Sequence, residues 1–235
     1  MLGVKTKTIK ISRSFWTKVT KGKLSNDVAI RRLMEYFIAD DYGHQAKTIK
    51  ADLGYGWIHY SFIRAIKPRN ILCIGSRHGY IPAVLAQACK DNNRGQVDFV
   101  DSGYGPEDKN HWTGEGYWKT KKGRECFKNF GLEKWISLHI MTTSKFAQKT
   151  KRTYNYIYID GDHSYKGVSL DYKLFWPRLK SGGFMAFHDV SITKPKSEGL
   201  YGVHKLWKEI SEKQAFILPF KGSGLGMVQK GDENR

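Results

Sequence analysis

Residues 70–101 read NILCIGSRHGYIPAVLAQACKDNNRGQVDFVD, and two kinds of pattern alternate along this stretch. The short apolar run Asn70–Ile74 is typical of a buried strand, and a turn with glycine at both ends, Gly75–Gly79, follows it. Tyr80–Lys90 has the apolar spacing of a helix, and Val97–Asp101 is a second strand-like run. The order strand, helix, strand predicts a parallel sheet covered by helices.

The same rhythm continues to the C-terminal end. Two closing runs, Ala215–Phe220 and Gly226–Lys230, are joined through a Gly-Ser-Gly segment, as in an antiparallel hairpin. With right-handed crossovers, the pattern predicts an α/β fold: a Rossmann-like, doubly wound, seven-stranded, mostly parallel sheet with an antiparallel C-terminal hairpin. The other elements expected are strands at Ser137–Met141, Tyr154–Asp160 and Phe184–Asp189 (begun by Gly182-Gly183), and helices at 58–66, 119–129 (ended by Gly131), 165–176 and around Val203–Ile210.

The chain of 235 residues is long enough for one substantial domain. We expect residues 51–235 to form it and residues 1–50 to be an accessory basic arm with helices. One such helix is predicted from Asn26 onward, because apolar residues recur there at helical spacing. These residues are Ile30, Leu33, Met34, Phe37 and Ile38.

The charge is strongly basic, with 40 Lys and Arg against 22 Asp and Glu, a formal net charge of +18. Such a surface attracts polyanions and anionic substrates, although a solubility role explains it equally well. No apolar run approaches the ~20 residues of a membrane span, so no membrane partner is expected. The three cysteines are odd in number and widely spaced, which favours neither a disulfide framework nor a structural zinc site, and a cytoplasmic location is expected.

Ligands of open α/β sheets bind beyond the carboxyl ends of the strands, so the residues that follow each strand are candidates for the site. Glycine at positions 75 and 79 would let the backbone approach a ligand closely. Asp101 ends the second strand and can accept hydrogen bonds from both hydroxyls of a ribose. The alternative is a solvated acid at a strand end.

A denser group of polar residues follows the later strands. Asp160, Asp162 and His163 come after one strand, and His188 and Asp189 end the next. If these strands are neighbours, their ends lie only ~5 Å apart. Aspartate and histidine suit a divalent metal, and a carboxylate beside it could take a proton from a substrate hydroxyl. Alternatively, these acids cap turns.

At this point the sequence resembles a known family. Ile71–Gly79, Val97–Asp101, Asp160–Tyr165 and Trp176–Gly183 continuing to Asp189 look like the successive motifs of class I S-adenosylmethionine-dependent methyltransferases. The stretch IDGDHSYKGVSLDYKLFWPRLKSGGFMAFHDV is similar to the branch that contains macrolide-sugar and aminocoumarin-sugar O-methyltransferases. The resemblance covers about residues 55–230.

This resemblance implies S-adenosylmethionine as the cofactor, with magnesium or manganese as a further ligand. It implies Asp162 as the general base, acting beside Asp160. The metal ligands it implies are Asp160, His188 and Asp189. The cofactor-binding residues it implies are Gly75, Ser76, Arg77, Gly79, Asp101, Ser102, Thr143, Ser144 and Asp160.

Three positions depart from the family pattern. Cys73 stands where the family has an acid two residues before the first motif glycine. Thr142–Ser144 lack the aspartate that usually lies near the adenine, which removes an acceptor for its amino group. His188 stands where many metal-dependent members have an acid.

The reaction expected is transfer of the methyl group to a hydroxyl of a small molecule or sugar, with metal assistance. Methylation of a nucleic acid and a non-catalytic binding module remain alternatives. A nicotinamide-dependent oxidoreductase is disfavoured, because the first turn lacks the spacing G-x-G-x-x-G. The aromatic-rich loop Ser102–Trp118 is expected either to cover the acceptor as a mobile lid or to pack as ordinary structure.

Overall fold

The computed structural model describes residue 33 and residues 55–76, 78–103, 116–193, 201–210, 215–218 and 223–231. Leu33 is helical and fully buried in one of the core clusters, as its place in the predicted N-terminal helix requires. The other residues of the predicted accessory arm lie outside the described residues, as does Arg77. The division of the chain at residue 50 therefore stays a prediction.

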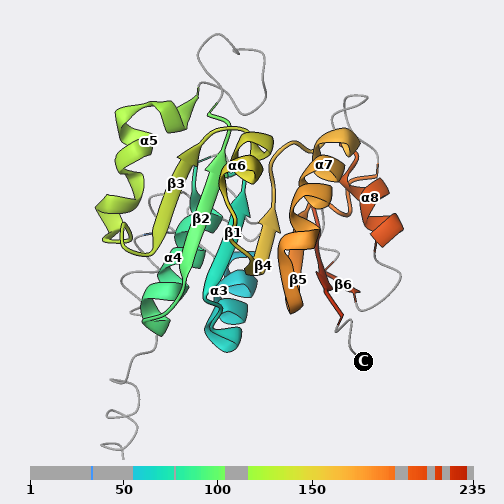
Figure 1. Ribbon diagram of the computed structural model, residues 1–235, viewed down its shortest axis with the longest axis horizontal. Coiled ribbons are helices and arrows are strands. Elements are labelled where there is room, and N and C mark those ends of the chain that lie inside the picture. Colours follow the sequence, from blue (N-terminus) through green and yellow to red (C-terminus); the bar gives the residue numbers. More distant parts are fainter. Residues whose placement is uncertain are drawn as a thin grey trace, which may run out of the picture.

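The strands form one seven-stranded sheet with the order β3-β2-β1-β4-β5-β7-β6 (Figure 1). The pairs from β3 through β5 are parallel, and β7 is antiparallel to both β5 and β6. The predicted doubly wound, mostly parallel sheet with an antiparallel C-terminal pair is thereby confirmed. The strands are β1 (Asn70–Ile74), β2 (Gln96–Asp101), β3 (Ile136–Ile140), β4 (Tyr154–Ile159), β5 (Leu179–His188), β6 (Ala215–Leu218) and β7 (Leu225–Gln229).

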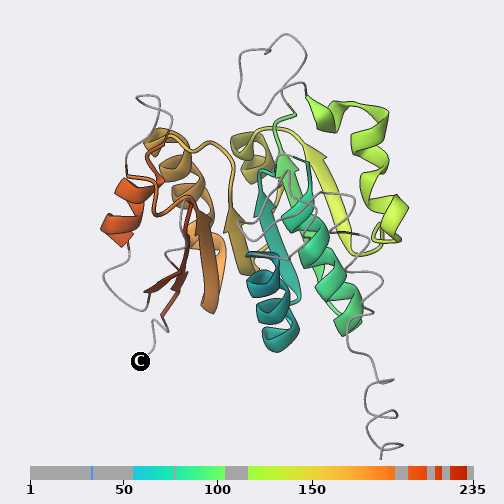
Figure 2. The ribbon, with the colours of Figure 1, turned by 180° about the vertical axis from the view of Figure 1, so that it is seen from behind.

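Helices cover both faces of this sheet. Figure 1 shows α6 and α7 in front of it, and the reverse view in Figure 2 brings α3 and α4 forward. The helices are α3 (Tyr55–Ile66), α4 (Tyr80–Asn92), α5 (Lys121–Glu125), α6 (Thr143–Lys149), α7 (Tyr165–Phe175) and α8 (Val203–Ile210). Within the parts of the chain that the structure describes, none of these helices has both the length and the apolar character to cross a membrane.

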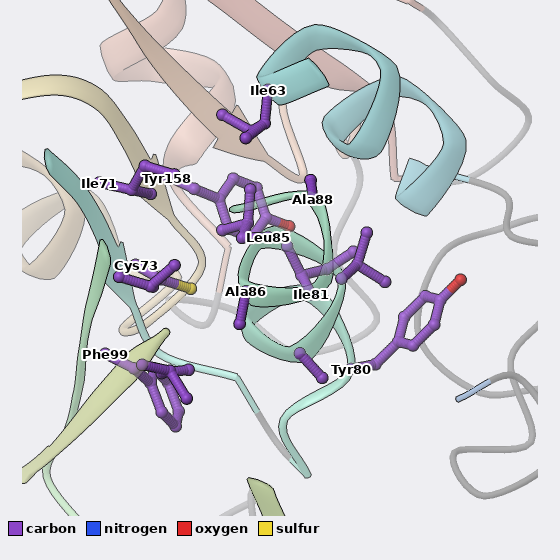
Figure 3. Close-up of a cluster of buried hydrophobic side chains, with 14 of the residues drawn as sticks. Ile63, Ile71, Cys73, Tyr80, Ile81, Leu85, Ala86, Ala88, Phe99 and Tyr158 are labelled. Atoms are coloured by element: carbon purple, nitrogen blue, oxygen red, sulfur yellow. The ribbon is translucent and has the colours of Figure 1, made fainter. Parts of the chain in front are cut away.

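Strand β1 is the centre of the core, because its side chains alternate between the two faces of the sheet. Ile71 and Cys73 belong to the cluster under α3 and α4, whereas Leu72 and Ile74 belong to the cluster under α6 and α7. Figure 3 shows the first of these clusters, with side chains of α4 packed against β1, β2 and β4. A strand buried on both faces explains why its sequence is continuously apolar.

Three elements differ from the sequence prediction. The single helix expected at 119–129 is broken into a 3-10 turn (Tyr117–Lys119), α5 and a second 3-10 segment (Cys126–Phe130). It is broken because the Thr120 hydroxyl caps a new helix by accepting from the Gly123 amide at 3.1 Å. The predicted stop at Gly131 is confirmed by its left-handed conformation.

Strand β5 begins at Leu179, before the glycine pair that was expected to start it. It reaches back because its pairing with β4 changes register between Tyr154 and Tyr156. Helix α6 was not predicted at all. Thr142 caps it by accepting from the Lys145 amide at 3.3 Å, and a helix this short has too few turns to show an apolar period.

Candidate active site

A pocket of about 340 Å³ lies at the carboxyl ends of β1, β2 and β4. It sits where the chain order reverses, because β1 is flanked by β2 on one side and by β4 on the other. This switch point is where open α/β sheets bind ligands. The lining comes from five segments: the turn after β1, the end of β2, residues 116–118, the start of α6, and the segment from the end of β4 into α7.

Gly75 forms the floor of this pocket. Its φ is +72°, and a Cβ there would lie 2.4 Å from both the carbonyl oxygen of Asp160 and the α-carbon of Gly161. The amide of Gly75 donates to Val100 at 2.9 Å, and the amide of Asp160 donates to Ile74 at 2.8 Å. The ends of three strands are thus held together at a point that only glycine fits.

The far side of the same turn is supported from below by Trp118. A Cβ on Gly79, whose φ is +95°, would lie 2.6 Å from the Trp118 ring. The Trp118 indole N–H donates to the carbonyl of Ser76 at 3.1 Å, and the Ser76 hydroxyl accepts from the Gly79 amide at 3.1 Å. Trp118 is therefore packed against the turn, and both Trp118 and its neighbour Tyr117 line the pocket.

Asp101 lies where a ribose acceptor was expected, at the end of β2. Its carboxylate accepts a hydrogen bond from the Gly103 amide at 2.8 Å, which fixes its orientation beside the pocket. Burial raises the pKa of Asp101 to about 6, even though backbone amides of Gly103 and Ser76 favour the charged form. A partly desolvated carboxylate of this kind is stabilised when ligand hydroxyls donate to it.

The second group of polar residues lies between the ends of β4 and β5, which are sheet neighbours as the sequence analysis required. Asp160 and Asp189 flank two imidazole rings. His163 Nε2 is 3.3 Å from Asp160 Oδ1, and His163 Nδ1 is 2.9 Å from Asp189 Oδ2. His188 Nδ1 is 3.0 Å from Asp189 Oδ1 and 3.4 Å from Asp160 Oδ1.

The electrostatics of this carboxylate–imidazole cluster follow from its burial. Burial alone would lower the pKa of His163, but hydrogen bonds to Asp160 and Asp189 outweigh it and raise that pKa to about 10. The pKa of Asp189 is held below its usual range, because His188 and His163 outweigh the opposite effect of burial. Asp189 also has φ +61°, so its backbone is left-handed where β5 ends.

The donor set of this cluster fits a divalent ion. Asp160, His163 and Asp189 each offer one ligand atom, and these atoms lie within 4.8 Å of one another. The contacts of His163 with Asp160 and Asp189 use its two different ring nitrogens, so only one of these nitrogens could bind the ion. Mixed carboxylate and imidazole donors suit manganese as well as magnesium. His163, which the resemblance did not imply as a ligand, groups with the predicted Asp160 and Asp189, while His188 contacts the same carboxylates.

Asp162, the predicted base, lies on the pocket wall and is exposed. Its Oδ1 accepts from the Ser164 amide at 2.9 Å, so it also forms the turn that leads into α7. A Cβ on Gly167 would lie 2.2 Å from the Asp162 carboxyl carbon, which shows how closely the side chain rests on α7. Both interpretations of this acid, turn cap and pocket residue, therefore hold at once.

Most of the predicted site residues meet in one place. The structure brings Gly75, Ser76, Asp101, Ser102, Thr143, Ser144, Asp160 and Asp162 together in the lining of the pocket. Gly79 caps α4 behind the turn, and Arg77 lies outside the described residues. His188 and Asp189 lie in the carboxylate–imidazole cluster, which reaches the pocket through Asp160.

Asp171 is a pocket residue that the sequence analysis missed. It is 4% exposed, and burial raises its pKa to about 7, against a hydrogen bond from Thr143. A signal was present in the sequence, since Asp171 lies three residues after Val168 and four before Phe175, on the buried side of α7. An acid on the apolar stripe of a helix is a candidate for a functional group.

Comparison with known proteins identifies the family. Residues 72–190, just over half of the chain, match the family model described as a methyltransferase domain, and the chain belongs to this family. The matched residues run from β1 to the end of β5, so they include the glycine turn, Asp101 and the carboxylate–imidazole cluster. The prediction that the chain is a methyltransferase is confirmed at this level.

Solved structures agree with this assignment in fold. The O-methyltransferase from Bacillus cereus, in complex with SAH, has a TM-score of 0.59 and 13% identity over 91% of this chain and 96% of that chain. The O-methyltransferase TomG from Streptomyces achromogenes, involved in tomaymycin synthesis and in complex with SAM, has a TM-score of 0.59 and 13% identity over 93% of this chain and 96% of that chain.

A curated relative is the uncharacterized protein y4gI of Sinorhizobium fredii, 24% identical over 173 residues, or 73% of this chain. This chain spans only 18% of the length of that relative.

Proposed function

We propose that this protein transfers the methyl group of S-adenosylmethionine to a hydroxyl of a small molecule or sugar. The charge of the pocket is the observation that carries the proposal. Among the described lining residues there are four carboxylates, of Asp101, Asp160, Asp162 and Asp171, and no Lys or Arg. S-Adenosylmethionine carries a sulfonium and an ammonium group, which such a pocket attracts, whereas the two phosphates of a nicotinamide dinucleotide are repelled.

In this proposal the residues of the pocket position the cofactor. Asp101 accepts from the ribose hydroxyls, and Gly75 and Ser76 leave room for the methionine part. Thr143 and Ser144 flank the adenine. The main contribution of the protein is to hold the sulfonium methyl and the acceptor oxygen at near-attack distance, which removes much of the entropic part of the barrier.

Asp162 takes the proton of the acceptor hydroxyl. Its carboxylate is exposed at the pocket wall and is oriented by the Ser164 amide, which leaves lone pairs directed elsewhere for a substrate proton. Asp160, His163 and Asp189 would hold magnesium or manganese. When bound, such an ion lowers the pKa of a coordinated hydroxyl.

The first test is the melting temperature with S-adenosylmethionine, with NAD, and with each in the presence of manganese, magnesium or a chelator. A ligand at ~100 times its dissociation constant stabilises a protein by about 2.7 kcal/mol, enough to shift the melting temperature measurably. We expect a shift with S-adenosylmethionine and none with NAD. A shift with NAD alone, or with neither ligand, contradicts the proposal.

A nucleic-acid acceptor is the second candidate, because the net charge is +18. The described pocket is acidic, so this positive charge would have to act on a polyanion from outside the pocket. RNA binding that falls steeply as salt is raised favours this candidate, and binding that is absent at low salt excludes it. The sugar acceptor and the cytoplasmic location stay predictions.

A further inference from the structure

One end of the pocket is formed where α6 and α7 meet. Thr143 and Asp171 both line the pocket, and they are hydrogen-bonded to each other at this end. Thr143 and Ser144 carry hydroxyls and no carboxylate, so the start of α6 offers no charged acceptor to a nucleobase. Asp171 comes to this end from a different element, the middle of α7.

The surroundings of the Asp171 carboxylate leave it in need of a donor. It is 4% exposed, and its Oδ2 lies 3.5 Å from where a Cβ on Gly161 would be, directly over the end of β4. The Thr143 side chain donates one hydrogen bond to Asp171, and the charge of Asp162, another acid, also acts on Asp171. No cation neutralises Asp171 among the residues that the structure describes. A buried carboxylate with one neutral donor is stabilised by a further N–H donor from a ligand.

Leu170 supplies the apolar part of the same end. This side chain lines the pocket and is 44% exposed, one of the few large apolar side chains of the described chain that face solvent to this extent. An exposed leucine beside a buried acceptor matches a flat apolar ring that carries an amino group on its edge. A ring with a carbonyl oxygen at that position would instead place one hydrogen-bond acceptor next to another, the Asp171 carboxylate, and the two would repel each other.

We propose that Asp171 accepts a hydrogen bond from the exocyclic amino group of the adenine, while Leu170 covers the ring, and that this contact selects adenosine over its 6-oxo counterpart. The inference rests on the proposed cofactor. In this inference Asp171 of α7 supplies the acceptor for the adenine amino group that residues 142–144 lack.

The test compares the dissociation constants of S-adenosylhomocysteine and S-inosylhomocysteine by titration calorimetry. A hydrogen bond to a buried carboxylate predicts that the unmodified protein binds the adenine compound about 10- to 100-fold more tightly. In Asp171→Asn this preference falls to within about threefold, because a carboxamide can donate to the 6-oxo group as readily as it accepts from an amino group. Asp91→Asn is the matched control, since Asp91 lies on α4 and pairs with Tyr60 and Gln87, and it keeps the full preference.

The outcomes separate this inference from the proposed function. If the unmodified protein binds S-adenosylhomocysteine but does not discriminate between the two compounds, the role of Asp171 is refuted, whether or not the variant folds. A preference that survives in Asp171→Asn refutes it as well. Failure of the unmodified protein to bind S-adenosylmethionine or S-adenosylhomocysteine overturns the proposed function itself, and the inference with it.

Discussion

Gly75 and Asp160 are in contact across two strands, so that a Cβ on Gly75 would lie 2.4 Å from the Asp160 carbonyl oxygen. This contact joins the two halves of the site. Gly75 turns the chain away from β1 and lines the pocket. The side chain of Asp160 lies in the carboxylate–imidazole cluster. A change at one residue must therefore displace the other.

Gly75→Ala is expected to destabilise the protein and to abolish binding of S-adenosylmethionine. A left-handed alanine costs about 1 kcal/mol, and the collision with the backbone of Asp160 and Gly161 adds more. Gly182→Ala is a matched control, because Gly182 has nearly the same φ, +71°, with nothing within 4 Å of its added Cβ. Urea denaturation measures both, and equal losses in the two variants would show that the contact at Gly75 is relaxed without cost.

The sequence was enough to predict the sheet and the position of the pocket. Residues 71–74 of β1 are apolar because both faces of the strand are buried there, and the turn at Gly75 and the acid at Asp101 follow from local pattern. These features depend on near neighbours in the chain. The side-chain period and the glycine spacing therefore report them directly.

Other parts of the site depend on contacts that no local pattern contains. His163 joins Asp189 only because β5 pairs with β4. Asp171 reaches the pocket only because α7 packs against α6, where Thr143 meets it. The break in the helix expected at 119–129 follows from the Thr120 cap, whose hydroxyl accepts from the Gly123 amide.

Asp189→Asn tests the metal site with little backbone strain, because asparagine tolerates the left-handed conformation of residue 189. We expect the unmodified protein to gain melting temperature with manganese and the variant to gain none. The variant should also lose about 3 kcal/mol of stability without metal, since two buried imidazoles lose their shared carboxylate. Calorimetric scans with manganese and with a chelator measure both effects. A manganese shift of normal size in the variant would exclude Asp189 as a ligand.

Asp101→Asn is expected to make the ligand-free protein more stable at pH 8 and to weaken its binding of S-adenosylmethionine. The raised pKa of Asp101, about 6, means that the folded protein holds its proton more tightly than the unfolded chain, for which the value is 3.8. The tighter proton binding stabilises the folded protein below about pH 4, and this contribution to the free energy of unfolding is lost as the pH rises to about 6. At pH 8 the ligand-free variant should therefore be about 1 kcal/mol more stable than the unmodified protein, a figure reduced for solvent screening.

The pH comparison for Asp101 also has a functional readout. The variant should lose affinity for S-adenosylmethionine at least about tenfold, because an amide replaces the acceptor of the ribose hydroxyls. Denaturation at pH 4 and pH 8, together with calorimetric titration at pH 8, separates the two effects. If the variant is less stable than the unmodified protein at pH 8, the stability prediction is wrong. If it binds S-adenosylmethionine normally, the role of Asp101 as the ribose acceptor is wrong.

Asp98 supports the fold away from the pocket, and its loss should spare cofactor binding. This buried carboxylate of β2 contacts Arg152 at 3.1 Å, the imidazole of His139 at 3.0 Å and the hydroxyl of Tyr154 at 3.1 Å. Burial alone would raise its pKa, but these partners outweigh burial and lower it. Its stabilisation is therefore present above the unfolded value of 3.8 and is lost as the pH falls through the lower folded pKa.

Asp98→Asn should accordingly be about 1–2 kcal/mol less stable than the unmodified protein at pH 7, and the difference should shrink below about pH 3.5. The lower end of this range allows for Arg152, which is 48% exposed and screened by solvent. S-Adenosylmethionine should bind the variant as it binds the unmodified protein. A constant stability difference from pH 7 to pH 3 would mean that Asp98 acts through packing and not through its charge. Reduced affinity would mean that the edge of the sheet at β3 is coupled to the pocket.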